Sequence, residues 1–165
     1  MVIRPDSEAQ LQTLRLPAAQ VDQAFGILLI SGPCMTLDKW RSYAQARIKA
    51  PASAAGIVSV QCGRAFIHGL FGYEIGPADI DRCMTIDLFI ACDQIGDRIV
   101  RTMIAAAEDI ASDQACSAIH IGSQQFRAAN VIVLEPKLLA AMSESGYVIE
   151  SIQLSKTLHP ETAGS

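Results

Sequence analysis

The sequence predicts an α/β (α+β) domain built on a mixed, mostly antiparallel central sheet, with a βαβ unit and helices on both faces. The 165 residues are half hydrophobic and only 18% charged, a composition that excludes disorder for the body of the chain and supports one sizeable core. The predicted segments run strand, helix, helix, hairpin, strand, helix, strand, helix, strand. We expect one domain over residues 1–158 and a polar, flexible tail at 159–165.

The first third of the chain predicts one strand and two helices. Val2–Arg4 is expected to form a short strand, because Pro5 ends its pairing. Apolar residues recur at helical spacing from Ala18 to Ile30, and the segment Ser31–Pro33 ends that helix. Thr36 is suited to cap a second helix. The apolar face of this second helix carries Leu37, Trp40, Ala44 and Ile48.

The next segments change to a strand pattern. Gly56–Cys62 and Ala65–Ile75 are rich in β-branched and aromatic residues and are separated by a Gly-Arg pair, which predicts an antiparallel hairpin. Gly69 and Gly72 lie inside its second strand and indicate either a bulge or the close approach of another segment or a ligand. The segment Cys83–Ala91 predicts a further strand.

The last third alternates helices and strands. Asp97–Ser112 is the clearest helix, since its apolar residues form one stripe. Cys116–Gly122 is nearly all apolar, which predicts a buried strand with a parallel neighbour. Pro136–Glu144 predicts a helix with Gly146 as its C-terminal cap. A final strand is expected at Tyr147–Leu158.

Charge and composition narrow the class of protein. A net charge of −4 and a pI near 5.3 argue against a nucleic-acid binder that works through a general basic field. No signal peptide is expected, and the run AFGILLI is too short to span a bilayer, so we expect a cytoplasmic protein with no membrane or nucleic-acid partner. Wide spacing of the cysteines indicates reduced thiols rather than disulfides or structural zinc. They are Cys34, Cys62, Cys83, Cys92 and Cys116.

The order of elements, together with the segment LFIACDQIGDRIVRTMI from Leu88 to Ile104, resembles the GNAT-type N-acetyltransferases. In that family the fourth strand splays from the fifth, the pantetheine arm lies in the gap, and the next turn holds the pyrophosphate at a helix N-terminus. The resemblance implies acetyl-CoA or another acyl-CoA as cofactor and a small-molecule or peptide amine as acceptor. It assigns cofactor binding to Leu88, Phe89, Ile90, Gln94, Ile95, Gly96 and Arg98.

The sequence also departs from the family's pattern. The family's turn has the form [RQ]-x-x-G-x-[GA], and here Arg98 and Val100 stand where small residues are expected beside Gly96. Arg98 either supplies charge to the phosphates or belongs to the solvated face of the helix. Many members of the family have a tyrosine on the last helix that acts as general acid. Its position corresponds to Met142 in this sequence, and a thioether cannot donate a proton. Tyr147 matches a packing position of the family.

Acyl transfer from a thioester to an amine needs a base that takes the ammonium proton. The resemblance places a carboxylate near Asp87 or Glu74 in this role. The alternative is that Asp87 is a strand-edge acid and Glu74 a loop acid, both facing water. His68, inside the second hairpin strand, is the remaining candidate because its unperturbed pKa lies near neutrality. Alternatively, His68 is a hydrogen-bonded core residue. Regular alternation places it on the same face of the strand as Phe66 and Leu70, opposite Ile67.

Three functions therefore stay open at the level of sequence. The first is an acyl-CoA-dependent acyltransferase, and the second is a GNAT-fold binding or regulatory module that has lost transfer chemistry. The third is an unrelated small α/β domain with a coincidental order of elements. Exposed sheet edges and an apolar chain also predict a homodimer.

Overall fold

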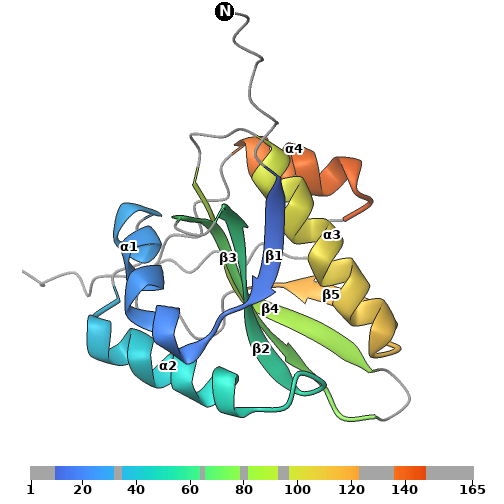
Figure 1. Cartoon of the computed structure of the whole chain (residues 1–165). Coiled ribbons are helices and arrows are strands. Elements are labelled where there is room, and N and C mark those ends of the chain that lie inside the picture. Colours follow the sequence, from blue (N-terminus) through green and yellow to red (C-terminus); the bar gives the residue numbers. More distant parts are fainter. Residues whose placement is uncertain are drawn as a thin grey trace, which may run out of the picture.

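The computed structural model describes residues 10–31, 35–63, 66–78, 82–92, 97–122 and 136–147. Its centre is a five-stranded sheet in the order β1-β2-β3-β4-β5 (Figure 1). The strands are β1 (Leu11–Arg15), β2 (Ala55–Cys62), β3 (Phe66–Ile75), β4 (Cys83–Ala91) and β5 (Ala118–Ile121). The first four pair antiparallel and β5 pairs parallel to β4, which confirms the mixed, mostly antiparallel sheet.

Helices cover both faces of this sheet (Figure 1). They are the 3₁₀ turn η1 (Ala18–Gln20), α1 (Val21–Ser31), α2 (Leu37–Lys49), α3 (Asp97–Asp113) and α4 (Pro136–Glu144). α1 and α2 pack on one face, α3 packs on the other, and α4 contacts α3. Within the described ranges, no helix combines the length and apolar character that crossing a membrane requires.

Several helical predictions are confirmed in detail. The Thr36 side chain accepts a hydrogen bond from the Lys39 amide at 3.4 Å and so caps α2. Trp40 is fully buried, and its indole N–H donates to the Val21 carbonyl at 2.7 Å. Gly146 adopts a φ of +87° directly after α4, the left-handed conformation of a C-terminal cap.

The first strand differs from the prediction. The expected strand Val2–Arg4 and most of the expected last strand lie outside the described residues, as does the tail at 159–165. The strand that pairs with β2 is β1, which the sequence did not indicate. β1 is an edge strand with mostly exposed side chains, so it lacks the apolar alternation by which a strand is recognised.

Two β-bulges change which side chains face which helices. Gly72 pairs with Leu88 but Tyr73 pairs with Ile86, so Asp87 is an extra residue in β4. Before this bulge Met84 and Ile86 pack on the α3 side, and after it Leu88 packs on the α1–α2 side. The bulge therefore shifts the alternation of β4, so that even-numbered side chains face α3 before Asp87 and face α1 and α2 after it.

The second bulge lies in β3 at His68. Val60 pairs with Gly69 and Gln61 pairs with Ile67, which leaves His68 without a partner in β2. As a result Ile67 packs in the same cluster as Leu70. The prediction that Ile67 lies on the opposite face from Leu70 is therefore wrong, because it assumed an unbroken alternation.

Candidate functional site

The pairing of β4 with the described part of β5 ends next to the bulge. β5 pairs with β4 only from Cys83 to Ile86, and the Gly122 amide closes this ladder on the Ile86 carbonyl at 2.9 Å. In the described part of the chain, no residue pairs with this edge beyond Ile86. From Asp87 to Ala91, the described residues supply no partner for the backbone N–H and C=O groups on this side of the strand. β5 pairs parallel to β4 as predicted. Its side chains are half-exposed, so the strand is less buried than expected.

A cluster of polar side chains lies under α2 at the same bulge. The Arg47 Nη2 group donates to Glu74 Oε1 at 2.9 Å and also contacts Asp87 Oδ2. The Tyr43 hydroxyl donates to the other oxygen, Asp87 Oδ1, at 2.7 Å. The Arg47 guanidinium lies over the Tyr43 ring, with Cζ 3.9 Å from the ring centroid. One arginine thus links the two carboxylates that the sequence singled out.

Gly72 makes room for this cluster. A Cβ at this position would lie 2.0 Å from the Tyr43 hydroxyl oxygen and 3.3 Å from Asp87 Oδ1. A Cβ at Gly69, on the other face, would lie 2.6 Å from the Met103 sulfur in α3. Both glycines therefore mark close approaches of helical side chains, and Gly72 also lies opposite the bulge of β4.

Replacing Gly72 with alanine is expected to destabilise the protein by about 1–3 kcal/mol, because the new methyl group overlaps the Tyr43 hydroxyl and must push it away from Asp87. Urea unfolding measures the change. Gly26→Ala is the matched control, since nothing lies within 4 Å of a Cβ on this helical glycine, and we expect it to stabilise by roughly 0.5–1 kcal/mol. Equal stability of Gly72→Ala and the wild type would contradict the tight packing.

Burial divides the cluster into a fixed and an accessible part. Arg47 and Asp87 are only 4% and 8% exposed, whereas the Glu74 side chain is 55% exposed. Burial raises the pKa of Asp87, and the Tyr43 hydroxyl and the Arg47 guanidinium partly offset this effect. Burial and the Asp87 carboxylate raise the pKa of Tyr43, which therefore stays a neutral donor. One guanidinium faces two carboxylates, so the cluster is net negative and Glu74 is its accessible acid.

Arg15 fixes the end of α2 that carries Arg47. Its Nη2 group donates to the carbonyl of Arg47 at 3.2 Å and to the carbonyls of Ala50 at 2.5 Å and Ala55 at 3.3 Å. The bonds to Arg47 and Ala50 satisfy carbonyls that the C-terminus of a helix leaves without partners, and they place a cation at the negative end of the helix dipole. The position of Arg47 is thus set by β1 as well as by α2.

The structure brings together only part of the predicted catalytic set. Glu74 and Asp87 meet through Arg47, but His68 lies six residues before Glu74 on β3, about 20 Å away along an extended strand. Sequence reasoning missed Tyr43 and Arg47. The signal was available, because Arg47 lies three and seven residues after Ala44 and Trp40 and so shares their buried face of α2.

The residues predicted to bind the cofactor lie along β4 and at the start of α3. Leu88 and Ile90 are buried under α1 and α2, while the Phe89 ring packs toward α3, 6.4 Å from the ring of Phe71. A ligand on the β4 edge would therefore meet backbone groups rather than these side chains. Arg98 is exposed in the first turn of α3. Gln94, Ile95 and Gly96 lie outside the described residues.

Met142 and Tyr147, the two candidates near the C-terminal end of the described residues, lie in α4 and just after it. Met142 is buried in α4. Burial raises the pKa of Tyr147 to about 12, and the neighbouring Glu108 carboxylate of α3 adds to the effect. The Tyr147 hydroxyl is thus directed to α3 rather than to β4, as a packing residue would be.

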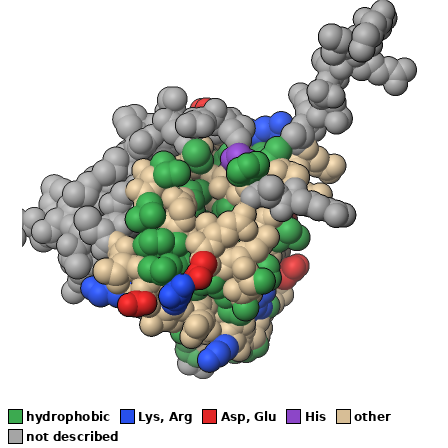
Figure 2. Space-filling model, turned by 60° about the vertical axis from the view of Figure 1, so that its left-hand side comes forward, with side chains coloured by type: hydrophobic (Ala, Val, Ile, Leu, Met, Phe, Trp, Pro, Cys, Tyr) green, Lys and Arg blue, Asp and Glu red, His purple; other side chains and the backbone are tan. Residues whose placement is uncertain are grey.

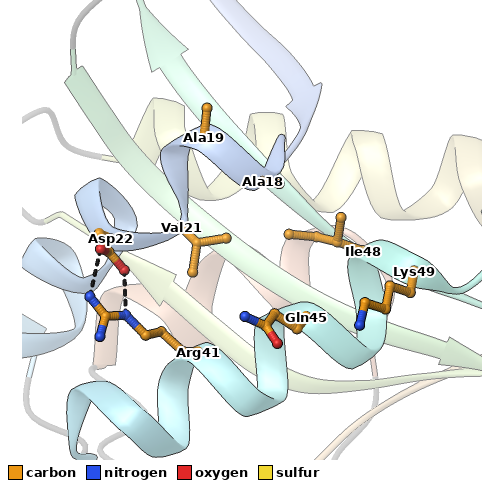
Figure 3. A pocket seen from close by; sticks show the side chains of 8 residues that line it. All are labelled: Ala18, Ala19, Val21, Asp22, Arg41, Gln45, Ile48 and Lys49. Carbon is orange, nitrogen blue, oxygen red and sulfur yellow. Dashed lines mark hydrogen bonds and ion pairs between the residues drawn. The ribbon is translucent and has the colours of Figure 1, made fainter.

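A hollow and an apolar area lie elsewhere on the described surface. A hollow of about 510 Å³ lies between η1 and α2, where Asp22 and Arg41 point toward one another and bond at 2.7 Å (Figure 3). None of its lining residues belongs to the predicted site. Apolar side chains gather on the face that Figure 2 shows. On α1, Leu29 and Ile30 are 66% and 80% exposed.

Comparisons with known proteins give matches in structure alone. No protein-family model matches the sequence, and no curated protein matches it. A transcriptional regulator from Bacillus halodurans C-125 is 13% identical with a TM-score of 0.68, over 90% of this chain and 100% of that one. Glucosamine-6-phosphate N-acetyltransferase from Arabidopsis thaliana is 11% identical with a TM-score of 0.65, over 91% and 99%. An aminoglycoside N-acetyltransferase in complex with CoA is 8% identical with a TM-score of 0.64, over 98% and 100%.

At these identities the likeness defines the fold. The chain has the fold of the GNAT-type N-acetyltransferases, as its order of elements indicated. The similar protein from Bacillus halodurans is described as a transcriptional regulator, so a likeness of fold does not by itself assign an activity. The function has to be argued from the site.

Proposed function

We propose that the protein is an acyl-CoA-dependent acyltransferase that moves an acetyl or other acyl group to an amine. The observation that carries this proposal is the bulge at Asp87, which follows Ile86, the last residue of β4 that pairs with the described part of β5. An extended arm with amide groups, such as the pantetheine of CoA, can bond to such an edge as an added strand does. One similar structure is a complex with CoA.

The acyl donor would lie along the backbone of Leu88, Phe89 and Ile90. Its pyrophosphate would then reach the start of α3, where the exposed Arg98 can supply positive charge. The segment with Gln94, Ile95 and Gly96 leads into this helix end and belongs to the same proposal. Arg98 would thus do by charge what small residues in the family's turn do by close backbone approach.

Glu74 is the proposed general base. Its carboxylate is accessible, and Arg47 holds one of its oxygens at 2.9 Å. Glu74 takes one proton from the ammonium group, and the free amine forms a C–N bond with the thioester carbonyl carbon. The C–S bond then breaks, and the second proton of the nitrogen passes through water to the released thiolate. Asp87 is unsuited to this role because both of its oxygens are occupied within a buried site.

A thiol-release assay tests this function. The protein is incubated with acetyl-CoA and a panel of small amines and peptides, and the free CoA thiol is measured over time. We expect release above the rate of uncatalysed hydrolysis with at least one amine. Binding of acetyl-CoA without release for any amine would favour the second candidate, an acyl-CoA-binding module without transfer chemistry. The observation behind that candidate is the buried Met142 at the place of the family's tyrosine.

The acceptor class, the compartment and the oligomeric state stay predictions. A small-molecule or peptide amine fits the net negative cluster with its accessible Glu74. We retain a cytoplasmic location and a homodimer, the latter because β1 is an exposed edge strand and α1 exposes Leu29 and Ile30. Sedimentation of the purified protein measures the oligomeric state directly.

A further inference from the structure

We propose that Tyr43, Arg47 and Asp87 form a clamp between α2 and β4 that holds the β4 bulge in place and so sets the register of the strand along which a ligand would lie. In this proposal Asp87 is a positioning residue, not a base. The consequence for acyl-CoA rests on the function proposed above. The mechanical claim about the bulge can be tested separately.

The first step is the location of Asp87. It is the extra residue of the bulge, between the pairs Tyr73–Ile86 and Gly72–Leu88. A bulge interrupts the ladder and leaves one residue unpaired, so it persists where other contacts hold that residue. Here the contacts come from α2, a helix about 40 residues away in sequence: the Tyr43 hydroxyl and the Arg47 guanidinium take one carboxylate oxygen each.

The second step is what the bulge does to the strand. β5 pairs up to Ile86 and no further among the described residues, and the side chains of β4 change face between Ile86 and Leu88. Without the extra residue, regular alternation would place Leu88 and Ile90 on the α3 side and expose the α1–α2 core. The register of β4 is therefore tied to Asp87.

The third step is the rigidity of the clamp. Arg15 bonds to the backbone carbonyl of Arg47, and the Arg47 guanidinium packs on the Tyr43 ring. Gly72 leaves space for the Tyr43 hydroxyl. Asp87 and Arg47 are both buried, and a buried charge that loses its partner is strongly unfavourable. The clamp therefore tends to be either complete or lost as a unit.

Two measurements on the wild type and four variants test the clamp. The variants are Asp87→Ala, which removes both acceptor oxygens, Asp87→Asn, which keeps one for the Tyr43 hydroxyl, and Tyr43→Phe, which keeps the ring under Arg47. Val58→Ala is the control, because it removes methyl groups from the α3-side core without touching the clamp. The first measurement is the amide hydrogen exchange rate of residues 86–90 by NMR, with residues 57–61 of β2 as the internal reference. The second is the Kd for CoA, by calorimetry.

We expect at least about a tenfold faster exchange at residues 86–90 in Asp87→Ala, relative to the β2 amides, with a smaller increase in Asp87→Asn and Tyr43→Phe. The Kd for CoA should rise about tenfold or more in Asp87→Ala and less in the other two clamp variants. Val58→Ala should change exchange at both places together and leave the Kd within about twofold.

Each outcome bears on one claim. If residues 86–90 of Asp87→Ala exchange as in Val58→Ala, at matched stability, the clamp is wrong whatever the CoA result. If the exchange changes as expected but the wild type binds no CoA, the clamp stands and the proposed function fails. If Asp87→Ala does not fold, Tyr43→Phe decides the exchange arm, because it removes the hydrogen bond to Asp87 and keeps the ion pair of Arg47 with Asp87.

Discussion

Replacing Arg47 with methionine is expected to lower the free energy of unfolding by about 3–5 kcal/mol, one of the largest effects of a single substitution in this protein. Methionine has a similar length and can pack along the same path. The loss comes from Asp87, which would remain buried and charged with only the Tyr43 hydroxyl as partner. Urea unfolding at neutral pH, followed by far-UV circular dichroism, measures the change.

A paired variant separates this cause from lost packing. Replacing both members, as Arg47→Met with Asp87→Leu, removes the two charges together and should recover most of the stability. It should not recover the exchange protection of β4, because leucine cannot bond to Tyr43. A loss below about 1 kcal/mol in Arg47→Met alone would mean that Asp87 is not charged and paired in the folded protein.

Replacing Glu74 with glutamine is expected to reduce the rate of acyl transfer by about 10²–10⁴-fold, the usual contribution of a positioned general base. Glutamine keeps the volume and an oxygen that can accept from Arg47, so the fold and the affinity for acetyl-CoA should not change. The rate is measured by thiol release at saturating acyl donor.

The control for Glu74→Gln is Glu144→Gln, which makes the same chemical change at an exposed carboxylate that pairs with Arg101 on the α3–α4 side. Its rate should match that of the wild type. If Glu74→Gln retains transfer within about threefold, Glu74 is not the base, and His68 on β3 becomes the residue to test by the same assay.

Much of the fold was predictable because the helices and inner strands carry strong periodic patterns. The bounds of β4 and α4 agree with the sequence segments Cys83–Ala91 and Pro136–Glu144, and the parallel pairing of β5 was expected. β1 was not predictable from its pattern, since an exposed edge strand has no buried face to show.

The site was only half predictable, for a physical reason. Glu74 and Asp87 were singled out as separate acids, but their connection depends on Arg47, which comes from a helix distant in sequence. The bulges were equally hidden. Cys83–Ala91 is mostly apolar, and both faces of this strand are buried. The change of face at Asp87 therefore cannot be recognised from the order of apolar residues in the sequence.

The role of Asp87 shows what the structure adds to the sequence. As a strand-edge acid it was expected either to serve as base or to face water. Instead it is buried, and its oxygens are bonded to Tyr43 and Arg47. Glu74 was expected either to act as base or to be a loop acid. It lies instead near the end of β3, next to this pair, and its side chain is accessible to solvent.

In the proposed function, the edge of β4 beyond Ile86 and the start of α3 hold an acyl-CoA. Calorimetric titration of CoA and acetyl-CoA into the wild type, Arg98→Ala and Arg101→Ala tests it most directly. Arg101 is the matched control, because it lies one turn further along α3 and pairs with Glu144. We expect binding at about micromolar Kd, weakened about tenfold in Arg98→Ala and unchanged in Arg101→Ala. Absence of binding of either ligand at millimolar concentration would contradict it.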